Sequence, residues 1–201
     1  MDKIKSLTGM LDLYDDGDNS LLPAKLFCLE EKIKHIFKSY KLNEIRTPVL
    51  EDANLFIRSV GGASDIVNKE IYSFNDRNDK GIALRPEGTA SVIRSIVEKK
   101  LDQSNQKLWY LCPMWRYERP QKGRYRQFNQ AGVEILGIPE GMPEFEMISI
   151  VCSIITEFNL ENCTIKINHL GNQKSKESFC NALIDFLEPH KKLLDEKDNQ
   201  R

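Results

Sequence analysis

The stretch WRYERPQKGRYRQFNQAGVEILG, from Trp115 to Gly137, joins a basic segment to an apolar run that Gln130 and Glu134 interrupt. Between Arg116 and Arg126 it carries five basic residues and a single acid, Glu118. The whole chain of 201 residues is nearly neutral, with 29 Lys and Arg against 30 Asp and Glu. Because such a balance gives no general attraction to nucleic acid or membranes, contacts with phosphate groups have to be made locally, in this segment.

Composition and absent motifs exclude several classes of protein. A content of 40% hydrophobic and 29% charged residues is typical of a soluble globular chain. We find no apolar run of membrane-spanning length and no signal peptide, so we expect a cytosolic protein without a membrane partner. The five scattered cysteines lack CxxC spacing, which predicts reduced thiols and no zinc site or other protein-encoded metal motif. The sequence also lacks GxxxxGK[ST], GxGxxG, GxSxG and HExxH.

The order of predicted elements indicates an α+β fold. An apolar stripe predicts a helix over 22–40, and the segment with Pro48 reads as extended. Two β-prone runs around a polar connection predict a hairpin over 70–88, followed by a helix over 89–100. Further elements are strands over 107–118 and 127–137, a helix over 143–158, a strand over 163–171 and a last helix that bends near Pro189. We therefore expect an antiparallel sheet with helices on one face.

Strand periodicity sorts the side chains of the segment onto two faces. Residues two apart share a face, so Phe128, Gln130, Gly132 and Glu134 lie together, opposite Asn129 and its apolar neighbours. On the preceding strand, Arg116 and Glu118 fall together. We expect these polar groups to surround Gly132, which leaves room for a ligand on the sheet.

A purely structural explanation stays open, because antiparallel sheets often turn a polar face to water. The basic loop and the segment RPEGTA argue against it. Glu87 and Thr89 flank Gly88 where a strand turns into a helix, so free backbone N–H groups and a carboxylate lie close together. Such a place suits the ammonium group of a zwitterion, or a phosphate.

The segments ALRPEGTA (83–90) and MWRYERPQKGRYRQFNQAGVEILG (114–137) resemble the histidyl-tRNA synthetases, members of the class II aminoacyl-tRNA synthetases. The resemblance extends from LTGMLDLY (7–14) through EIRTPVLED (44–52) to LEPHKKLLDE (187–196). It implies the class II antiparallel sheet flanked by helices, in a homodimer. The first class II motif would cover about 22–50 and form the dimer interface, and the second about 108–137.

The resemblance also implies a reaction: ATP-dependent activation of histidine to histidyl-adenylate, with Mg²⁺, followed by transfer to tRNA(His). Arg116 matches the family's catalytic arginine on the α-phosphate, and Glu134 matches the acid that binds the imidazole ring. The other implied contacts are to histidine (Glu87, Gly88, Thr89, Gln130), to ATP (Glu118, Arg124, Phe128) and to the tRNA acceptor end (Arg119, Lys122, Arg126). For the last three, a solvated loop is the alternative interpretation.

The sequence departs from the family pattern in two respects. Asn129 stands where histidine is usual, and we expect it to affect packing because it points away from the ligand face. The family's tyrosine pair, third motif and anticodon-binding domain do not occur in residues 1–201, so we interpret the chain as an N-terminal part of the catalytic domain. The alternatives are a non-catalytic paralogue similar to the regulatory subunit of ATP phosphoribosyltransferase, and a free-standing RNA-binding module.

Overall fold

The computed structural model describes residues 4–14, 23–60, 70–119, 121–169 and 171–193. Leu22, where the first helix was expected to begin, lies outside these ranges. The chain divides into two compact units, residues 1–161 and residues 162–201.

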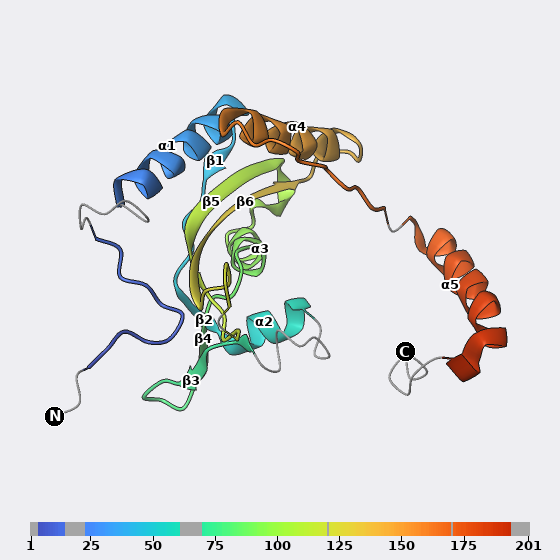
Figure 1. Ribbon diagram of the computed structural model, residues 1–201, viewed down its shortest axis with the longest axis horizontal. Helices are drawn as coiled ribbons and strands as arrows, with labels where there is room; N and C mark the ends of the chain where they lie inside the picture. Colours follow the sequence, from blue (N-terminus) through green and yellow to red (C-terminus); the bar gives the residue numbers. More distant parts are fainter. Residues whose placement is uncertain (1–3, 15–22, 61–69, 120, 170, 194–201) are drawn as a thin grey trace. The chain divides into compact units, whose positions relative to one another are not determined.

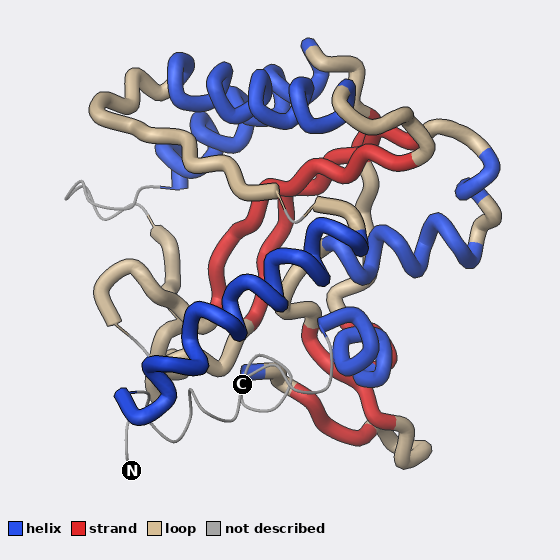
Figure 2. The backbone as a smooth tube through the Cα atoms, turned by 90° about the vertical axis from the view of Figure 1, so that its right-hand side faces the viewer, coloured by secondary structure: helices blue, strands red, loops and turns tan. Residues whose placement is uncertain are grey.

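The larger unit is organised by a long antiparallel pair of strands, β5 (Gln106–Trp115) and β6 (Gln127–Leu136). The two strands run side by side and curve together (Figures 1 and 2). The short strand β1 (Asn43–Glu44) adds to the other edge of β5, parallel to it, which gives the order β1-β5-β6. The predicted strand pair is thus confirmed, whereas the parallel third strand was not expected.

One face of this sheet is covered by α1 (Pro23–Ser39) and α4 (Met142–Glu157), which lie beside each other in Figure 1. Both helices were predicted. Their apolar side chains form one cluster with side chains from that sheet face; its members include Ile36, Phe37, Trp109, Leu111, Val133, Met147 and Ile150. Burial of this apolar area is the main stabilising contribution to the layer.

The opposite face carries α3 (Thr89–Glu98) at one end, on the inner side of the curve in Figure 1. Val92 and Ile96 of this helix pack against Leu108, Tyr110 and Met114 of β5. The expectation that helices cover one face only was therefore wrong. Even-numbered residues of β5 are mostly apolar, so their side chains, like those of the odd-numbered residues, are covered by a helix.

A second sheet, in the order β2-β4-β3, contains the predicted hairpin. Strands β3 (Ser73–Asn75) and β4 (Gly81–Leu84) are antiparallel, and β2 (Leu50–Asp52) pairs with the other edge of β4. Helix α2 (Ala53–Val60) follows β2 directly, and the 3₁₀ turn Leu101–Gln103 precedes β5. After β4, residues 85–88 lead straight into α3, which brings the hairpin's end to the β5–β6 pair.

The smaller unit contains α5 (Gln173–Leu187) and a 3₁₀ segment (Glu188–Leu193). The side chain of Asn172 caps α5 by accepting a hydrogen bond from the Ser175 N–H (2.9 Å). The 3₁₀ segment begins at Glu188, directly before Pro189, whose nitrogen has no hydrogen to donate to the helix. Among the described residues of 163–171 there is no strand, so that prediction was wrong. Ile167 there is 71% exposed, and alternation alone does not make a strand without a partner.

A search of the described residues found no helix long and apolar enough to cross a membrane.

Phe37 and Phe27 provide a matched test of the α1 layer. Phe37 is 2% exposed and its ring lies 5.4 Å from that of Trp109, whereas Phe27 on the same helix is 64% exposed. We expect Phe37→Ala to lower the free energy of unfolding by about 3–5 kcal/mol because it leaves a cavity in the core. Phe27→Ala should change it by less than about 0.5 kcal/mol. Urea denaturation of both variants checks this; similar losses would contradict the packing.

Candidate active site

The candidate active site lies on the face of β5 and β6 that meets the beginning of α3. In an antiparallel pair, directly opposed residues share a face. Phe128, Gln130, Gly132 and Glu134 stand opposite the even-numbered residues of β5, from Met114 to Leu108. The predicted alternation is therefore confirmed, and Asn129 lies on the other face. There its Nδ2 donates to Glu30 Oε1 of α1 (3.4 Å).

Arg116 continues the strand pairing one step beyond β5. Its backbone N–H donates to Arg126 O (2.9 Å), which fixes its place in the register. Its guanidinium Nε donates to Pro86 O (2.8 Å), and the group lies 5.1 Å from the centre of the Phe128 ring. The structure thus brings Arg116 and Phe128 together, beside the turn that leads into α3.

That turn is held by the carboxylate of Glu87. Its two oxygens accept hydrogen bonds from the backbone N–H groups of Thr89 (2.6 Å) and Ala90 (2.9 Å), the first donors of α3. These N–H groups would otherwise lack partners at a helix start. The expectation that they are free for a ligand was wrong. A phosphate would have to displace Glu87, whereas an ammonium group would find a carboxylate there.

Glu134 is linked to the same turn across the sheet. The Thr89 hydroxyl donates to Glu134 Oε1 (2.6 Å), and the carboxylate is half-buried. Burial raises the pKa of Glu134; the Thr89 hydrogen bond opposes this rise, and the nearby charge of Glu87 adds to it. The second oxygen of Glu134 has no hydrogen bond from another described side chain, so a ligand N–H can donate to it.

Tyr110 is the residue of the site that sequence reasoning missed. It is 4% exposed, and its ring lies between Gly88 and Gly132. A Cβ atom would lie 2.2 Å from its Cζ atom at Gly88 and 2.1 Å at Gly132. The space expected for a ligand above Gly132 is therefore filled by this ring. The signal was available, because Tyr110 stands directly opposite Gly132 and glycines often mark close approach in strands.

The hydroxyl of Tyr110 reaches the polar part of the site. Gln130 Nε2 donates to it at 3.4 Å, and burial raises the pKa of Tyr110 to about 12, so it stays protonated at neutral pH. Gln130 Oε1 is buried and has no hydrogen-bond partner in the part of the chain that the structure describes. A buried acceptor without a donor is costly, so this oxygen suits the ammonium group of a ligand.

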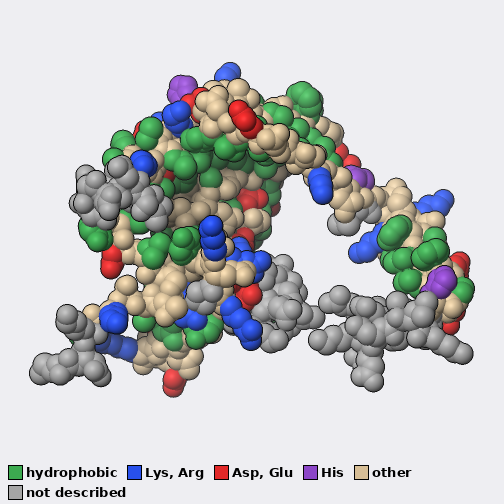
Figure 3. All heavy atoms as spheres, in the orientation of Figure 1, with side chains coloured by type: hydrophobic (Ala, Val, Ile, Leu, Met, Phe, Trp, Pro, Cys, Tyr) green, Lys and Arg blue, Asp and Glu red, His purple; other side chains and the backbone are tan. Residues whose placement is uncertain are grey.

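The loop between β5 and β6 gathers the positive charge. Lys and Arg side chains cluster at this end of the strand pair (Figure 3). Glu118 lies between two of them, with Oε2 3.4 Å from Arg124 Nη1 and Oε1 3.8 Å from Arg116 Nη1. Arg119 and Lys122 are exposed. Arg126 is instead packed 4.0 Å over the Tyr117 ring, with its Nε donating to Glu118 O (3.3 Å).

The arrangement offers a surface with two chemically different ends. At the Thr89 end, Glu87, Gln130 and Glu134 present oxygen acceptors to a group that donates hydrogen bonds. At the loop end, Arg116 and Arg124 present cations to an anion, next to the aromatic ring of Phe128. A bifunctional ligand with an amine and a phosphate would meet complementary partners at both ends.

Gly132→Ala tests the close approach of Tyr110. The added methyl group would overlap a buried ring, so we expect the free energy of unfolding to fall by about 1–3 kcal/mol. Gly81→Ala is the matched strand control, because its new Cβ would lie 3.9 Å from Ala53 Cβ, an ordinary contact. Chemical denaturation compares them, and an unchanged midpoint for Gly132→Ala would show that the ring does not lie there.

Glu134→Gln tests the buried carboxylate. The pKa of Glu134 in the folded state lies above 4.5, so the protonated side chain stabilises the folded protein relative to the unfolded chain. This stabilisation is complete below pH 4.5 and is lost as the pH rises through the raised pKa. Gln imitates the protonated form and can still accept from Thr89. We therefore expect the variant to match wild type in acid and to exceed it at pH 7, in denaturation curves across that range. The exposed Glu140→Gln should show no such divergence; a constant offset for Glu134→Gln would contradict the burial.

Comparison with known proteins identifies the family. The model of the histidyl-tRNA synthetase family matches residues 23–181. A histidine–tRNA ligase of Microcystis aeruginosa is 44% identical over 190 residues, which are 92% of this chain and 45% of that protein. The chain therefore spans about half the length of the curated relatives that it matches.

Solved structures agree in fold. The apo histidyl-tRNA synthetase of S. aureus superposes with a TM-score of 0.71 at 32% identity, over 96% of this chain and 46% of that one. A structure from Bacillus halodurans, described as an ATP phosphoribosyltransferase regulatory subunit/histidyl-tRNA synthetase, gives a TM-score of 0.64 at 21% identity over 78% of this chain and 38% of its own, which shows the fold alone. With a family match over most of its length and a relative at 44% identity, the chain belongs to the histidyl-tRNA synthetase family.

Proposed function

We propose that this chain supplies the amino-acid and α-phosphate contacts of a histidine–tRNA ligase, which activates histidine with ATP and transfers it to tRNA(His). The observation that carries the proposal is the common sheet face of Arg116, Phe128 and Glu134. Two hydrogen bonds connect this face to the turn before α3: Arg116 donates to the Pro86 carbonyl, and Thr89 donates to Glu134. One surface can therefore hold the two substrates whose atoms must meet.

Histidine would bind at the Thr89 end. The free oxygen of Glu134 would accept a hydrogen bond from an imidazole N–H, and Glu87, Thr89 and Gln130 would surround the α-ammonium group. Gly88 contributes to this end because it has no side chain, which lets the Tyr110 ring lie against its backbone. A half-buried carboxylate discriminates against amino acids without a ring N–H, because they leave it unpaired.

ATP would bind at the loop end. In the activation step, a carboxylate oxygen of histidine forms a bond to the α-phosphorus and the bond to pyrophosphate breaks. Two anions have to approach each other, so a fixed cation at that point lowers the barrier. Arg116 would supply it, and its planar guanidinium can contact both reacting groups. Arg124 would bind the outer phosphates, with Phe128 beneath adenine and Glu118 near the adenine edge.

Mg²⁺ fits this scheme as a companion of ATP. Among the described residues, no group of three His, Cys, Asp or Glu side chains could hold a metal ion. Mg²⁺ commonly binds through one or two carboxylates together with substrate phosphates. When bound, the ion would neutralise charge on the leaving pyrophosphate.

The remaining contacts concern macromolecules. The exposed Arg119 and Lys122 would guide the acceptor end of tRNA, and Arg126 would support the loop by its packing on Tyr117. Residues 22–50, the first class II motif, would form a homodimer interface; residues 108–137 are the second motif. Residues 1–201 would form the N-terminal portion of the catalytic domain. The proposal favours a ligase over a regulatory paralogue because the basic loop stands beside the amino-acid contacts that this chain carries, Glu87, Thr89, Gln130 and Glu134.

The proposal predicts that Glu134→Ala weakens histidine binding by about 10- to 100-fold, the cost of one lost buried hydrogen bond to a charged group. ATP affinity should change by less than about 3-fold, because Glu134 lies at the other end of the site. Arg124→Ala should show the reverse pattern, and the exposed Glu140→Ala should change neither. Calorimetric titration of each variant with histidine and with ATP measures this. Equal losses of both affinities in Glu134→Ala would reject the assignment.

A further inference from the structure

Residues 7–10 form a tight turn, here called the N-terminal turn, against the end of the basic loop. The Met10 N–H donates to Leu7 O (3.0 Å), and Gly9, the third residue of the turn, has a φ of +80°. A positive φ at this position is typical of a type II turn and favours glycine, because a side chain is strained there. A Cβ atom on Gly9 would also lie 3.0 Å from Arg126 Cγ and 3.1 Å from Arg126 N. The turn therefore contacts the backbone of Arg126 closely.

The carbonyl of Gly9 takes over a bond that belongs to the strand pair. Arg126 stands one step before β6, and its carbonyl accepts from the Arg116 N–H (2.9 Å). In a regular antiparallel ladder such a pair exchanges two bonds, so the Arg126 N–H would return to Arg116 O. It donates instead to Gly9 O (2.7 Å), and the Gln127 N–H lies 3.3 Å from the same oxygen. The N-terminal turn thus holds the chain at the point where the two strands separate into the basic loop.

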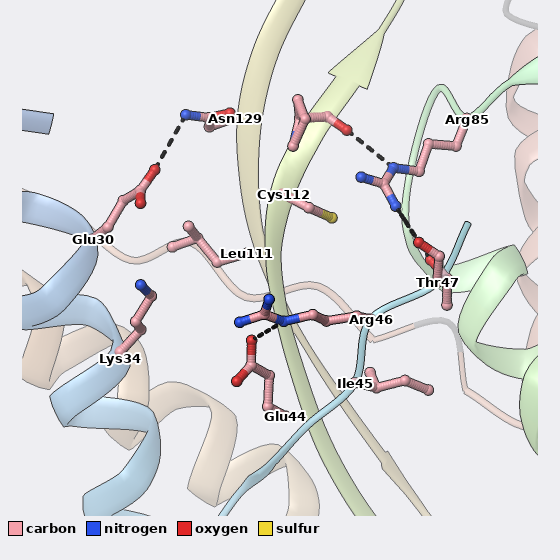
Figure 4. A pocket seen from close by; sticks show the side chains of 11 residues that line it. Glu30, Lys34, Glu44, Ile45, Arg46, Thr47, Arg85, Leu111, Cys112 and Asn129 are labelled. Carbon is pink, nitrogen blue, oxygen red and sulfur yellow. Dashed lines mark hydrogen bonds and ion pairs between the residues drawn. The ribbon is translucent and has the colours of Figure 1, made fainter. Parts of the chain in front are cut away.

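The acceptor of the Arg116 side chain is held by other contacts. Arg116 Nε donates to Pro86 O (2.8 Å). The residue before Pro86 is Arg85, which is 4% exposed, and its guanidinium donates to the carbonyl oxygens of Pro113 (3.0 Å) and Thr47 (2.7 Å), as Figure 4 shows. Because these buried contacts keep the acceptor in place, a shift of the Arg116 backbone would change the position of its guanidinium relative to Pro86.

We propose that the N-terminal turn is a positioning element for Arg116, acting through the backbone of Arg126. This role rests on the proposed function, since Arg116 is the residue that would contact the α-phosphate. Gly9 itself would touch neither histidine nor ATP. Its carbonyl keeps the Arg126 N–H out of the strand ladder, and the Arg126 carbonyl in turn fixes the Arg116 backbone. The turn is therefore needed for binding of the phosphate and not for binding of the amino acid.

Gly9→Ala disturbs this contact, and Gly141→Ala is the matched control. Gly141 also has a positive φ, +94°, but an added Cβ would meet nothing within 4 Å, so the control carries the backbone strain without the contact. NMR at low temperature measures hydrogen exchange of the Arg116 Nε–H and of the backbone N–H groups of Arg116 and Arg126. We expect all three to exchange at least about 10-fold faster in Gly9→Ala, because the strand end opens locally. The Tyr110 N–H, in the middle of the pair, should keep its rate, and Gly141→Ala should change none of them.

Calorimetric titration with ATP and with histidine provides the second readout. Gly9→Ala should weaken ATP binding about 3- to 10-fold, because the guanidinium of Arg116 no longer sits at the phosphate. Histidine affinity should change by less than about 2-fold, since Glu87, Gln130 and Glu134 keep their places. A purely structural role of the turn would lower both affinities together.

The proposal is overturned if the Arg116 Nε–H exchanges as slowly in Gly9→Ala as in the wild type. It is also overturned if the wild type binds ATP and the variant loses no more affinity for ATP than for histidine. If exchange accelerates as expected but the wild type binds no ATP, the turn still positions Arg116 and the proposed function fails. Gly9→Asn gives the same comparison should Gly9→Ala not fold, because asparagine tolerates a positive φ but still carries a Cβ atom against Arg126.

Discussion

The ring of Tyr110 between Gly88 and Gly132 is the contact on which the arrangement of the site depends. It places the first residue of α3 directly over the β5–β6 pair, because neither glycine has a side chain to hold the two backbones apart. Only at this spacing can the Thr89 hydroxyl reach Glu134 at 2.6 Å. Packing of an apolar ring thus sets the geometry of a polar site, and the hydrogen bonds follow from it.

Much of this layout could be predicted from the sequence, because strand alternation is a local rule. The common face of Met114 and Arg116, and that of Phe128, Gln130 and Glu134, follow from a period of two. Contacts between side chains and backbone groups that are distant in the sequence could not be predicted in this way. Tyr110 occupies the space above Gly132, and Glu87 takes the N–H groups of α3, because contacts between distant segments decide both.

The strand expected over 163–171 shows that alternation can also predict an element that the described residues there do not form. Ile165 and Ile167 alternate as in a strand, but pairing needs a neighbour, and local sequence does not contain one. In β5 the neighbour follows after a short loop, so periodicity and topology agree. The parallel addition of β1 to β5 could not be expected either, since Asn43 and Glu44 are separated from Leu108 and Trp109 by more than sixty residues.

Two polar groups of the site are buried at an energetic cost, the carboxylate of Glu134 and the amide oxygen of Gln130. Burial and the neighbouring charge of Glu87 both disfavour ionised Glu134, and Gln130 Oε1 is buried without a donor. A ligand that brings an ammonium group and a ring N–H would relieve both penalties at once, whereas an amino acid without the ring N–H would relieve only one. Selectivity would then come mainly from the free-energy penalty of the unpaired Glu134 carboxylate, which an amino acid without a ring N–H does not relieve. The strength of any single contact would matter less.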